Sequence, residues 1–212
     1  MSAPRVISLF FVRLILWYAL FLVLWAAAGN VYIAAYRTIG TSVFRTLFPS
    51  WDVVIEAARR PTDMWDSQLV QYNRRTQTRG IQPFGARYQG FAPTSVLMSL
   101  ILASPLRWRR RGRALLWGLA AVHVWIALSI WLMIVDGYSG ANAVAIYSFS
   151  PSVDYVLSFV TFLVTASTVP RYALPIFLWA LVTFRRGDWA AVFGPREARG
   201  TRRHGNDPSH SR

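Results

Sequence analysis

Two polar side chains inside apolar stretches are the first candidates for chemistry. Arg171 follows Pro170 in the last apolar stretch of the chain, and His123 lies inside the third. A charged side chain at the centre of a bilayer costs about 2.5–3.5 kcal/mol on insertion scales, so such residues often bind a ligand or mark a polar path. Arg171 either extends outward to the membrane surface or faces inward and binds a carboxylate, phosphate or peptide carbonyl group.

His123 has two interpretations as well. A histidine in a membrane helix can relay protons or bind a metal ion. No second histidine or carboxylate lies three or four residues away from His123, so its helix offers no metal pair. We therefore expect a neutral His123 hydrogen-bonded across helices, and the sequence predicts neither a metal site nor a cofactor.

Acidic side chains offer one further candidate pair. Asp63 and Asp66 enclose the segment Asp-Met-Trp-Asp, at a spacing that could share a cation or support acid/base chemistry. The same spacing suits two acids that cap and solvate one helical turn, which we favour. The chain has no cysteine, which excludes thiol catalysis and thiolate metal sites. It also lacks the glycine-rich phosphate loop and the Gly-x-Ser-x-Gly and His-Glu-x-x-His motifs. We expect a protein that is not an enzyme.

The elements that must position these residues are apolar helices. Of the 212 residues 54% are hydrophobic and only 15% are charged, whereas soluble domains average about 45–50% and about 25%. The pattern predicts membrane spans over Leu14–Tyr36, Tyr88–Leu106 and Ala114–Val135, and a fourth helix within Val153–Phe184. The last stretch is too long for one crossing, and we expect one helix that is broken or kinked at Pro170 and Pro175. The first span also resembles a signal with cleavage after Ala28, but its charge-free course to Tyr36 favours an uncleaved anchor.

The segment between the first two spans reads as a small α+β insertion. Apolar residues in Trp51–Arg60 are spaced as in an amphipathic helix. Two short apolar segments flank the polar, glycine-ended run Asn73–Gly80, which predicts a short β-hairpin. The expected organisation is a cytoplasmic N-terminus and first span (1–36), an extracytoplasmic insertion (37–87), spans two to four (88–184) and a basic, partly disordered cytoplasmic tail (185–212).

Arginine placement predicts the orientation. The short loop after the second span is dense in arginine, and no arginine lies between Asp136 and Ser152. Positive charge favours the cytoplasmic side, so we expect a multi-pass protein with both termini in the cytoplasm. The arginines of this loop could also bind lipid headgroups; they are Arg107, Arg109, Arg110, Arg111 and Arg113. All 23 basic residues are arginine, but no nucleic-acid-binding motif accompanies them, so we expect a bilayer rather than a nucleic acid as partner.

The order of parts resembles a known family. Arg87-Tyr88-Gln89-Gly90-Phe91 leads into Ala92-Pro93-Thr94-Ser95-Val96-Leu97, Leu102-Ala103-Ser104-Pro105 leads into Trp108-Arg109-Arg110-Arg111, and Pro170-Arg171-Tyr172-Ala173-Leu174-Pro175 precedes Trp179. These segments, between residues 66 and 184, resemble the small integral membrane proteins associated with exosortases in Gram-negative bacteria. The resemblance implies an inner-membrane accessory of a protein-sorting system linked to surface polysaccharide. Exosortases themselves use a membrane cysteine, which this chain lacks.

The sequence thus predicts a mostly α, four-helix integral membrane protein with a small extracytoplasmic α+β insertion between helices 1 and 2. Its expected role is that of a non-catalytic accessory in a bacterial inner membrane, in contact with another integral membrane protein. The alternative is a transporter or channel subunit in which Arg171 and His123 line a polar path. A membrane hydrolase or transferase that uses Asp63 or Asp66 is a third hypothesis.

Overall fold

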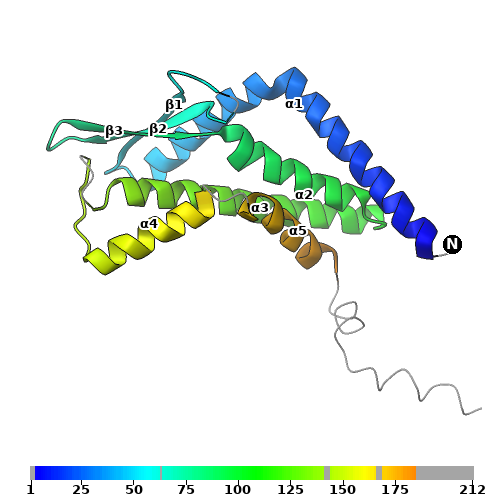
Figure 1. Cartoon of the computed structure of the whole chain (residues 1–212). Helices are drawn as coiled ribbons and strands as arrows, with labels where there is room; N and C mark the ends of the chain where they lie inside the picture. Colours follow the sequence, from blue (N-terminus) through cyan, green and yellow to red (C-terminus); the bar gives the residue numbers. More distant parts are fainter. Residues whose placement is uncertain (1–2, 63, 141–143, 166–168, 185–212) are drawn as a thin grey trace, which may run out of the picture.

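A computed structural model of the chain describes residues 3–62, 64–140, 144–165 and 169–184. The described chain is mostly helical and carries one small antiparallel sheet (Figure 1). In chain order the elements are α1 (Ala3–Leu47), β1 (Asp52–Ala57), β2 (Ser67–Asn73), β3 (Thr78–Phe84), the π-helical turn η1 (Arg87–Phe91), α2 (Ala92–Ala103), α3 (Trp108–Gly137), α4 (Pro151–Thr165) and α5 (Val169–Thr183). The expected tail, 185–212, lies outside the described residues.

Among the described helices, two are long and apolar enough to cross a membrane, over Ile7–Leu47 and Trp108–Gly137. The structure therefore supports membrane association through α1 and α3, whereas four long crossing helices were expected. At about 1.5 Å per residue, the 12 residues of α2 and the 15 residues of each of α4 and α5 fall short of a hydrocarbon core of about 30 Å.

Helix α1 is much longer than its expected span. Its 45 residues correspond to about 67 Å, and Figure 1 shows it as two limbs that meet at a bend. The apolar window within its membrane candidate is not covered by the rest of the protein; Ile15, Leu16 and Val23, for example, are exposed. Its last turns instead pack against the sheet, because Phe44 is buried and the Thr41 hydroxyl accepts a hydrogen bond from the Ile55 amide at 2.9 Å.

Helix α2 is the centre of the helical body. It packs against α1, α3 and α5, and its Leu97 and Ile101 side chains are fully buried. Gly118 of α3 permits the close approach, since a Cβ atom there would lie 3.1 Å from Ile101 Cδ1. The serines of α2 do not interrupt the apolar packing: Ser99 donates its hydroxyl hydrogen bond to the Ser95 carbonyl of the same helix at 2.7 Å.

The sheet has the order β1-β2-β3, with both neighbouring pairs antiparallel. The expected hairpin is confirmed, because β2 and β3 pair from Asn73 and Thr78 outward. The expected amphipathic helix over Trp51–Arg60 is wrong. Val53 and Ile55 alternate with more exposed neighbours and are buried in the core, a period-two pattern that belongs to strand β1.

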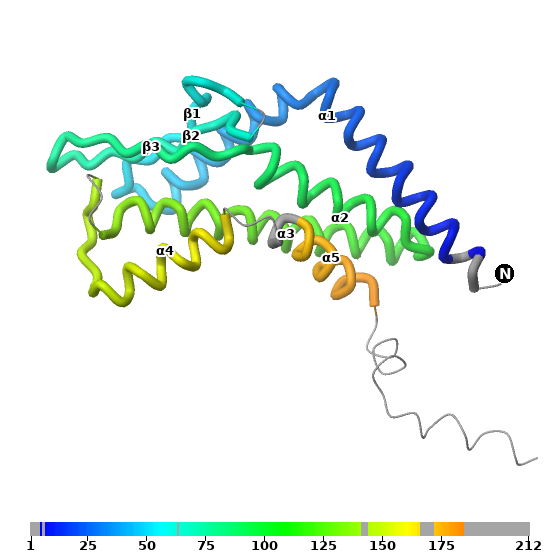
Figure 2. The backbone as a smooth tube through the Cα atoms, in the orientation of Figure 1, coloured from blue at the N-terminus to red at the C-terminus, as the bar shows by residue number. Residues whose placement is uncertain are grey.

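The fourth apolar stretch, expected as one helix broken or kinked at Pro170 and Pro175, is described as two helices, α4 and α5. Figure 2 shows α4 and α5 following one another at an angle along the body. Pro170 stands in the first turn of α5, where an absent amide hydrogen costs no hydrogen bond. Pro175 lies inside α5 and is buried there. The helix continues through Pro175, so the expected break at this residue is not observed.

Candidate functional site

Asp66 is the better defined of the two candidate acids, since Asp63 lies outside the described residues. Its Oδ1 accepts hydrogen bonds from the Ser67 hydroxyl at 2.6 Å and the Ala86 amide at 2.9 Å, and its Oδ2 accepts one from the Arg87 amide at 3.2 Å. These two amides begin the helical run of η1 and α2, whose first N–H groups have no partner within the helix. Asp66 thus caps a distant helix rather than its own turn.

Arg37 holds the same junction from the side of α1. Its guanidinium donates to the Asp66 carbonyl oxygen at 2.9 Å and to the Ser67 hydroxyl at 3.1 Å. The start of β2 is therefore tied both to the last third of α1 and to the start of η1. Because both carboxylate oxygens accept hydrogen bonds at this junction, Asp66 has a structural role there.

His123 and Arg171 are not shown to share a site. His123 is exposed on α3, and its Nδ1 lies 2.8 Å from the carbonyl oxygen of Leu119 on the same helix. A hydrogen bond across helices was expected, but this contact lies within α3. The backbone of Arg171 belongs to the first turn of α5, and its side chain lies outside the described parts.

The five arginines around 107–113 occupy different environments. Arg107, Arg109 and Arg113 are exposed. The Arg110 guanidinium donates to the Thr183 carbonyl at the end of α5, and that of Arg111 donates to the Ser104 carbonyl at 3.0 Å. Arg110 and Arg111 lie in the first turn of α3 rather than in the expected loop, and they join the start of α3 to the ends of α5 and α2.

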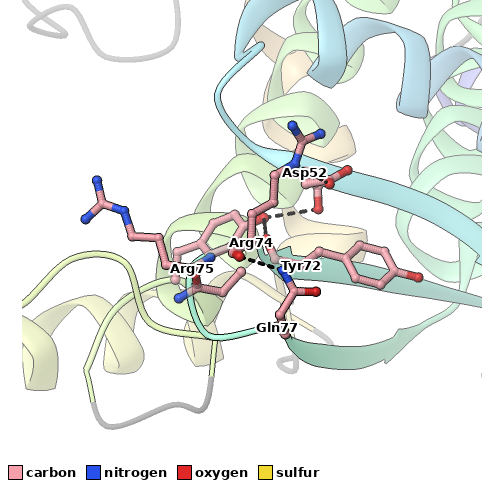
Figure 3. A network of polar contacts seen from close by, with 7 residues as sticks. Asp52, Tyr72, Arg74, Arg75 and Gln77 are labelled. Atoms are coloured by element: carbon pink, nitrogen blue, oxygen red, sulfur yellow. Dashed lines mark hydrogen bonds and ion pairs between the residues drawn. The ribbon is translucent and has the colours of Figure 1, made fainter.

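At the far end of the sheet, a cavity of about 220 Å³ opens beside the β2–β3 turn. Its described lining combines polar and aromatic side chains: Ser50, Trp51, Asp52, Tyr72, Asn73, Arg74, Arg75, Ile146 and Tyr147. Figure 3 shows the Arg74 side chain directed toward Asp52, while that of Arg75 extends away from this contact. The Arg74 Nε atom lies 3.0 Å from Asp52 Oδ2, but the Arg74 side chain is 83% exposed, so this ion pair contributes little to stability.

The turn beneath this cavity is fixed by local hydrogen bonds. Asn73 Oδ1 accepts from the Arg75 amide at 2.9 Å, and its Nδ2 donates to the Ala145 carbonyl at 2.9 Å. Gln77 adopts a positive φ of 54° and donates its side-chain amide to the Arg74 carbonyl at 2.7 Å. Such an asparagine-initiated turn fixes the backbone from which both arginine side chains project.

Tyr138 is fully buried next to Asp52 and Tyr72, two residues that line the cavity. Its hydroxyl donates to the Asp52 carbonyl at 3.1 Å and lies 3.4 Å from the Tyr72 carbonyl. Burial, reinforced by the Asp52 carboxylate, raises the pKa of the Tyr138 phenol to about 12. The phenol is therefore neutral at physiological pH and serves as a hydrogen-bond donor that joins β1 and β2 to the end of α3.

An exposed apolar surface, the outer strip, begins at this cavity. It consists of Ile146, Tyr147, Phe149, Tyr155, Val156, Phe159, Phe162 and Leu163, each at least 40% exposed. Its five members on α4 recur at spacings of one, three and four residues, so they share one helix face. The Ser158 hydroxyl donates to Asp136 Oδ1 of α3 at 2.7 Å, and Trp51 Nε1 donates to the Tyr147 hydroxyl at 3.1 Å.

Asp52, the carboxylate in the cavity wall, is paired with Arg74, and the described lining includes no histidine. Among the residues that the structure describes, no group of three or more His, Cys, Asp or Glu side chains could hold a metal ion. Guanidinium and aromatic groups at a cavity next to an apolar surface are typical of a protein-binding region.

Sequence reasoning did not identify Arg37 or Tyr138 as important. Their partners lie far away along the chain, and the sequence carries no local signal for such contacts. No protein-family model, curated protein or solved structure matches this chain.

Proposed function

We propose that this chain is a non-catalytic accessory protein of a bacterial inner membrane that binds a larger integral membrane protein through its outer strip. The outer strip is the observation that carries the proposal. In line with the resemblance noted from the sequence, an exosortase-type sorting enzyme is the proposed partner. The chain crosses the bilayer four times with both termini in the cytoplasm, through α1, α2 with η1, α3 and α5.

The proposed crossings of α2 and α5 depend on the packing of the helical body. Helix α2 contacts α1, α3 and α5, so its short length is compensated by neighbours that cover it within the membrane. Together η1 and α2 run from Arg87 to Ala103, about 25 Å at the helical rise. Trp179 of α5 donates to the Ser104 hydroxyl at 2.8 Å, which joins the ends of α2 and α5.

Helix α4 is the part that needs a partner. Its 15 residues reach about 22 Å, too short to cross the bilayer alone. Yet Tyr155 is 74% exposed and Phe162 is 63% exposed. Burial of a phenylalanine side chain contributes about 1.5–3 kcal/mol, so a protein partner that covers this face gains substantial free energy. Aromatic residues are also enriched in protein interfaces.

Contacts with α3 fix the orientation of this face. Helix α4 packs along α3, and the Ser158–Asp136 hydrogen bond sets its rotation. A preoriented surface loses little conformational entropy on binding. The strip is therefore suited to a specific partner.

Site-specific photo-crosslinking in intact cells tests the proposal. A photoreactive phenylalanine analogue at Phe159 is compared with the same analogue at Val124, which is 68% exposed on α3. We expect Phe159 to form a discrete adduct with an integral membrane enzyme, and Val124 to form lipid adducts. The double substitution Phe159→Ala and Phe162→Ala should reduce co-purification of that enzyme in mild detergent. Lipid adducts alone at Phe159, identical to those at Val124, would contradict the proposal.

A further inference from the structure

A second cavity, of about 380 Å³, lies at the opposite end of the helical body from the sheet, where the start of α3 meets the end of α5. Its described lining is Arg110, Arg113, Ala114, Trp117, Leu181, Val182 and Phe184. Two arginines thus line this cavity together with two aromatic and three aliphatic residues. This volume falls in the range of small-molecule sites.

The helical repeat places the charged and apolar groups of α3 on one face. Arg110, Arg113 and Trp117 follow one another at spacings of three and four residues, which brings them together on the helix surface. Arg109, by contrast, is exposed and is not among the described residues that line this cavity. Arg110 and Arg113 therefore differ from Arg109 in their position relative to the cavity, a difference that composition alone does not reveal.

One of the two arginines is held in place by α5. The Arg110 guanidinium donates to the carbonyl oxygen of Thr183, in the last turn of α5, which holds the two walls together. Arg113 lies one turn further along α3 and is exposed, so its guanidinium is available to a ligand. Trp117 is 67% exposed and Leu181 is 58% exposed, beside this charged rim.

We propose that this cavity binds the phosphodiester headgroup of an anionic phospholipid at the cytoplasmic surface of the membrane. Arginine presents a planar fork of donors that matches phosphate oxygens, and Arg113 provides the principal contact. An acyl chain of the same lipid lies along Trp117 and Leu181, because tryptophan favours the level of the headgroups. The inference depends on the proposed crossing of the bilayer but not on the protein partner.

Lipid titration monitored by native mass spectrometry tests the site. The full-length protein in detergent is titrated with phosphatidylglycerol and, separately, with water-soluble glycerol 3-phosphate. We expect Arg113→Gln to weaken the binding of phosphatidylglycerol about fivefold, the effect of one interfacial arginine. The matched variant Arg109→Gln should leave this affinity within about twofold of that of the unmodified chain.

Each alternative outcome overturns the assignment. Equal weakening by Arg113→Gln and Arg109→Gln would show diffuse attraction of lipid to positive charge. Equal affinity for glycerol 3-phosphate and phosphatidylglycerol would show a site for free anions. Absence of phosphatidylglycerol binding would refute the site directly. A failure here differs from failure of the proposed function, because crosslinking at Phe159 at the other end of the body does not involve Arg113.

Discussion

Asp66 provides a direct test of how the sheet is joined to the helices. The substitution Asp66→Ala removes the acceptor of three hydrogen bonds, donated by the Ser67 hydroxyl and the Ala86 and Arg87 amides. Loss of a helix cap costs about 0.5–2 kcal/mol, and a hydrogen bond to a charged group contributes about 1.5–3 kcal/mol. Because Asp66 is half-buried, water replaces part of this loss. We expect a net destabilisation of about 2 kcal/mol.

Thermal unfolding in detergent, followed by circular dichroism, measures this loss. For a chain of this size, about 2 kcal/mol corresponds to a decrease in Tm of about 4–8 °C. The control is Asp52→Ala, which removes the ion pair with Arg74, whose side chain is 83% exposed. Because an exposed pair contributes less than about 1 kcal/mol, its Tm should fall by less than about 4 °C.

The order of the Tm values of Asp66→Ala and Asp52→Ala tests whether Asp66 caps η1 and α2. If Asp66→Ala unfolds at the same temperature as Asp52→Ala or higher, Asp66 does not cap η1 and α2. Asp66→Asn adds a second comparison, since the amide oxygen can keep one of the amide contacts. Its Tm should lie between those of the unmodified chain and Asp66→Ala.

Three further predictions concern other parts of the chain. Gly137→Ala should destabilise the protein by about 1–3 kcal/mol, because the new Cβ atom would overlap Gln71 Oε1. Gly112→Ala should instead stabilise α3 by about 0.5–1 kcal/mol, because no atom lies within 4 Å of the new Cβ atom. Chemical denaturation in detergent distinguishes the two signs. Tyr138 has its pKa raised from 10.0 to about 12 in the folded state, so its contribution to stability is complete below pH 10 and is lost as pH rises through 12. Tyr138→Phe should therefore show a smaller loss of stability across this interval in a pH series of melting curves, and an unchanged slope would refute the assignment. A cysteine at Thr76 should react with an impermeant thiol reagent in intact spheroplasts and one at Gly112 should not; the reverse pattern would overturn the proposed orientation.

The sequence predicted those parts of the fold that depend on local patterns. The apolar runs within α1 and α3 indicated membrane helices, and the glycine-ended turn between β2 and β3 indicated a hairpin. Strand β1 was mistaken for a helix because Trp51, Val54 and Ile55 also fit a helical repeat. Pairing with β2 decides the conformation, since Val53 and Ile55 become buried only in the assembled sheet.

The candidate site was less predictable because its contacts are distant in sequence. Asp66 was expected to cap and solvate one turn of helix together with Asp63, whereas its carboxylate accepts a hydrogen bond from the Ala86 amide, 20 residues later in the chain. The Tyr138–Asp52 contact joins residues 86 positions apart. The exposure of the outer strip has no local sequence signal either, because only the packing of α4 along α3 determines which of its apolar residues stay uncovered.

The continuity of α1 has a mechanical consequence. One helix runs without interruption from Ala3 to Leu47, and Arg37 and Thr41 attach its last turns to the sheet. The sheet is therefore joined to the apolar part of α1 by continuous, bent helix rather than by an irregular linker. Insertion of a single residue into α1 before Arg37 would rotate the attached sheet by about 100° about the helix axis, relative to the N-terminal part of α1. The direction in which the turn beside Arg74 faces therefore depends on the number of residues in this helix.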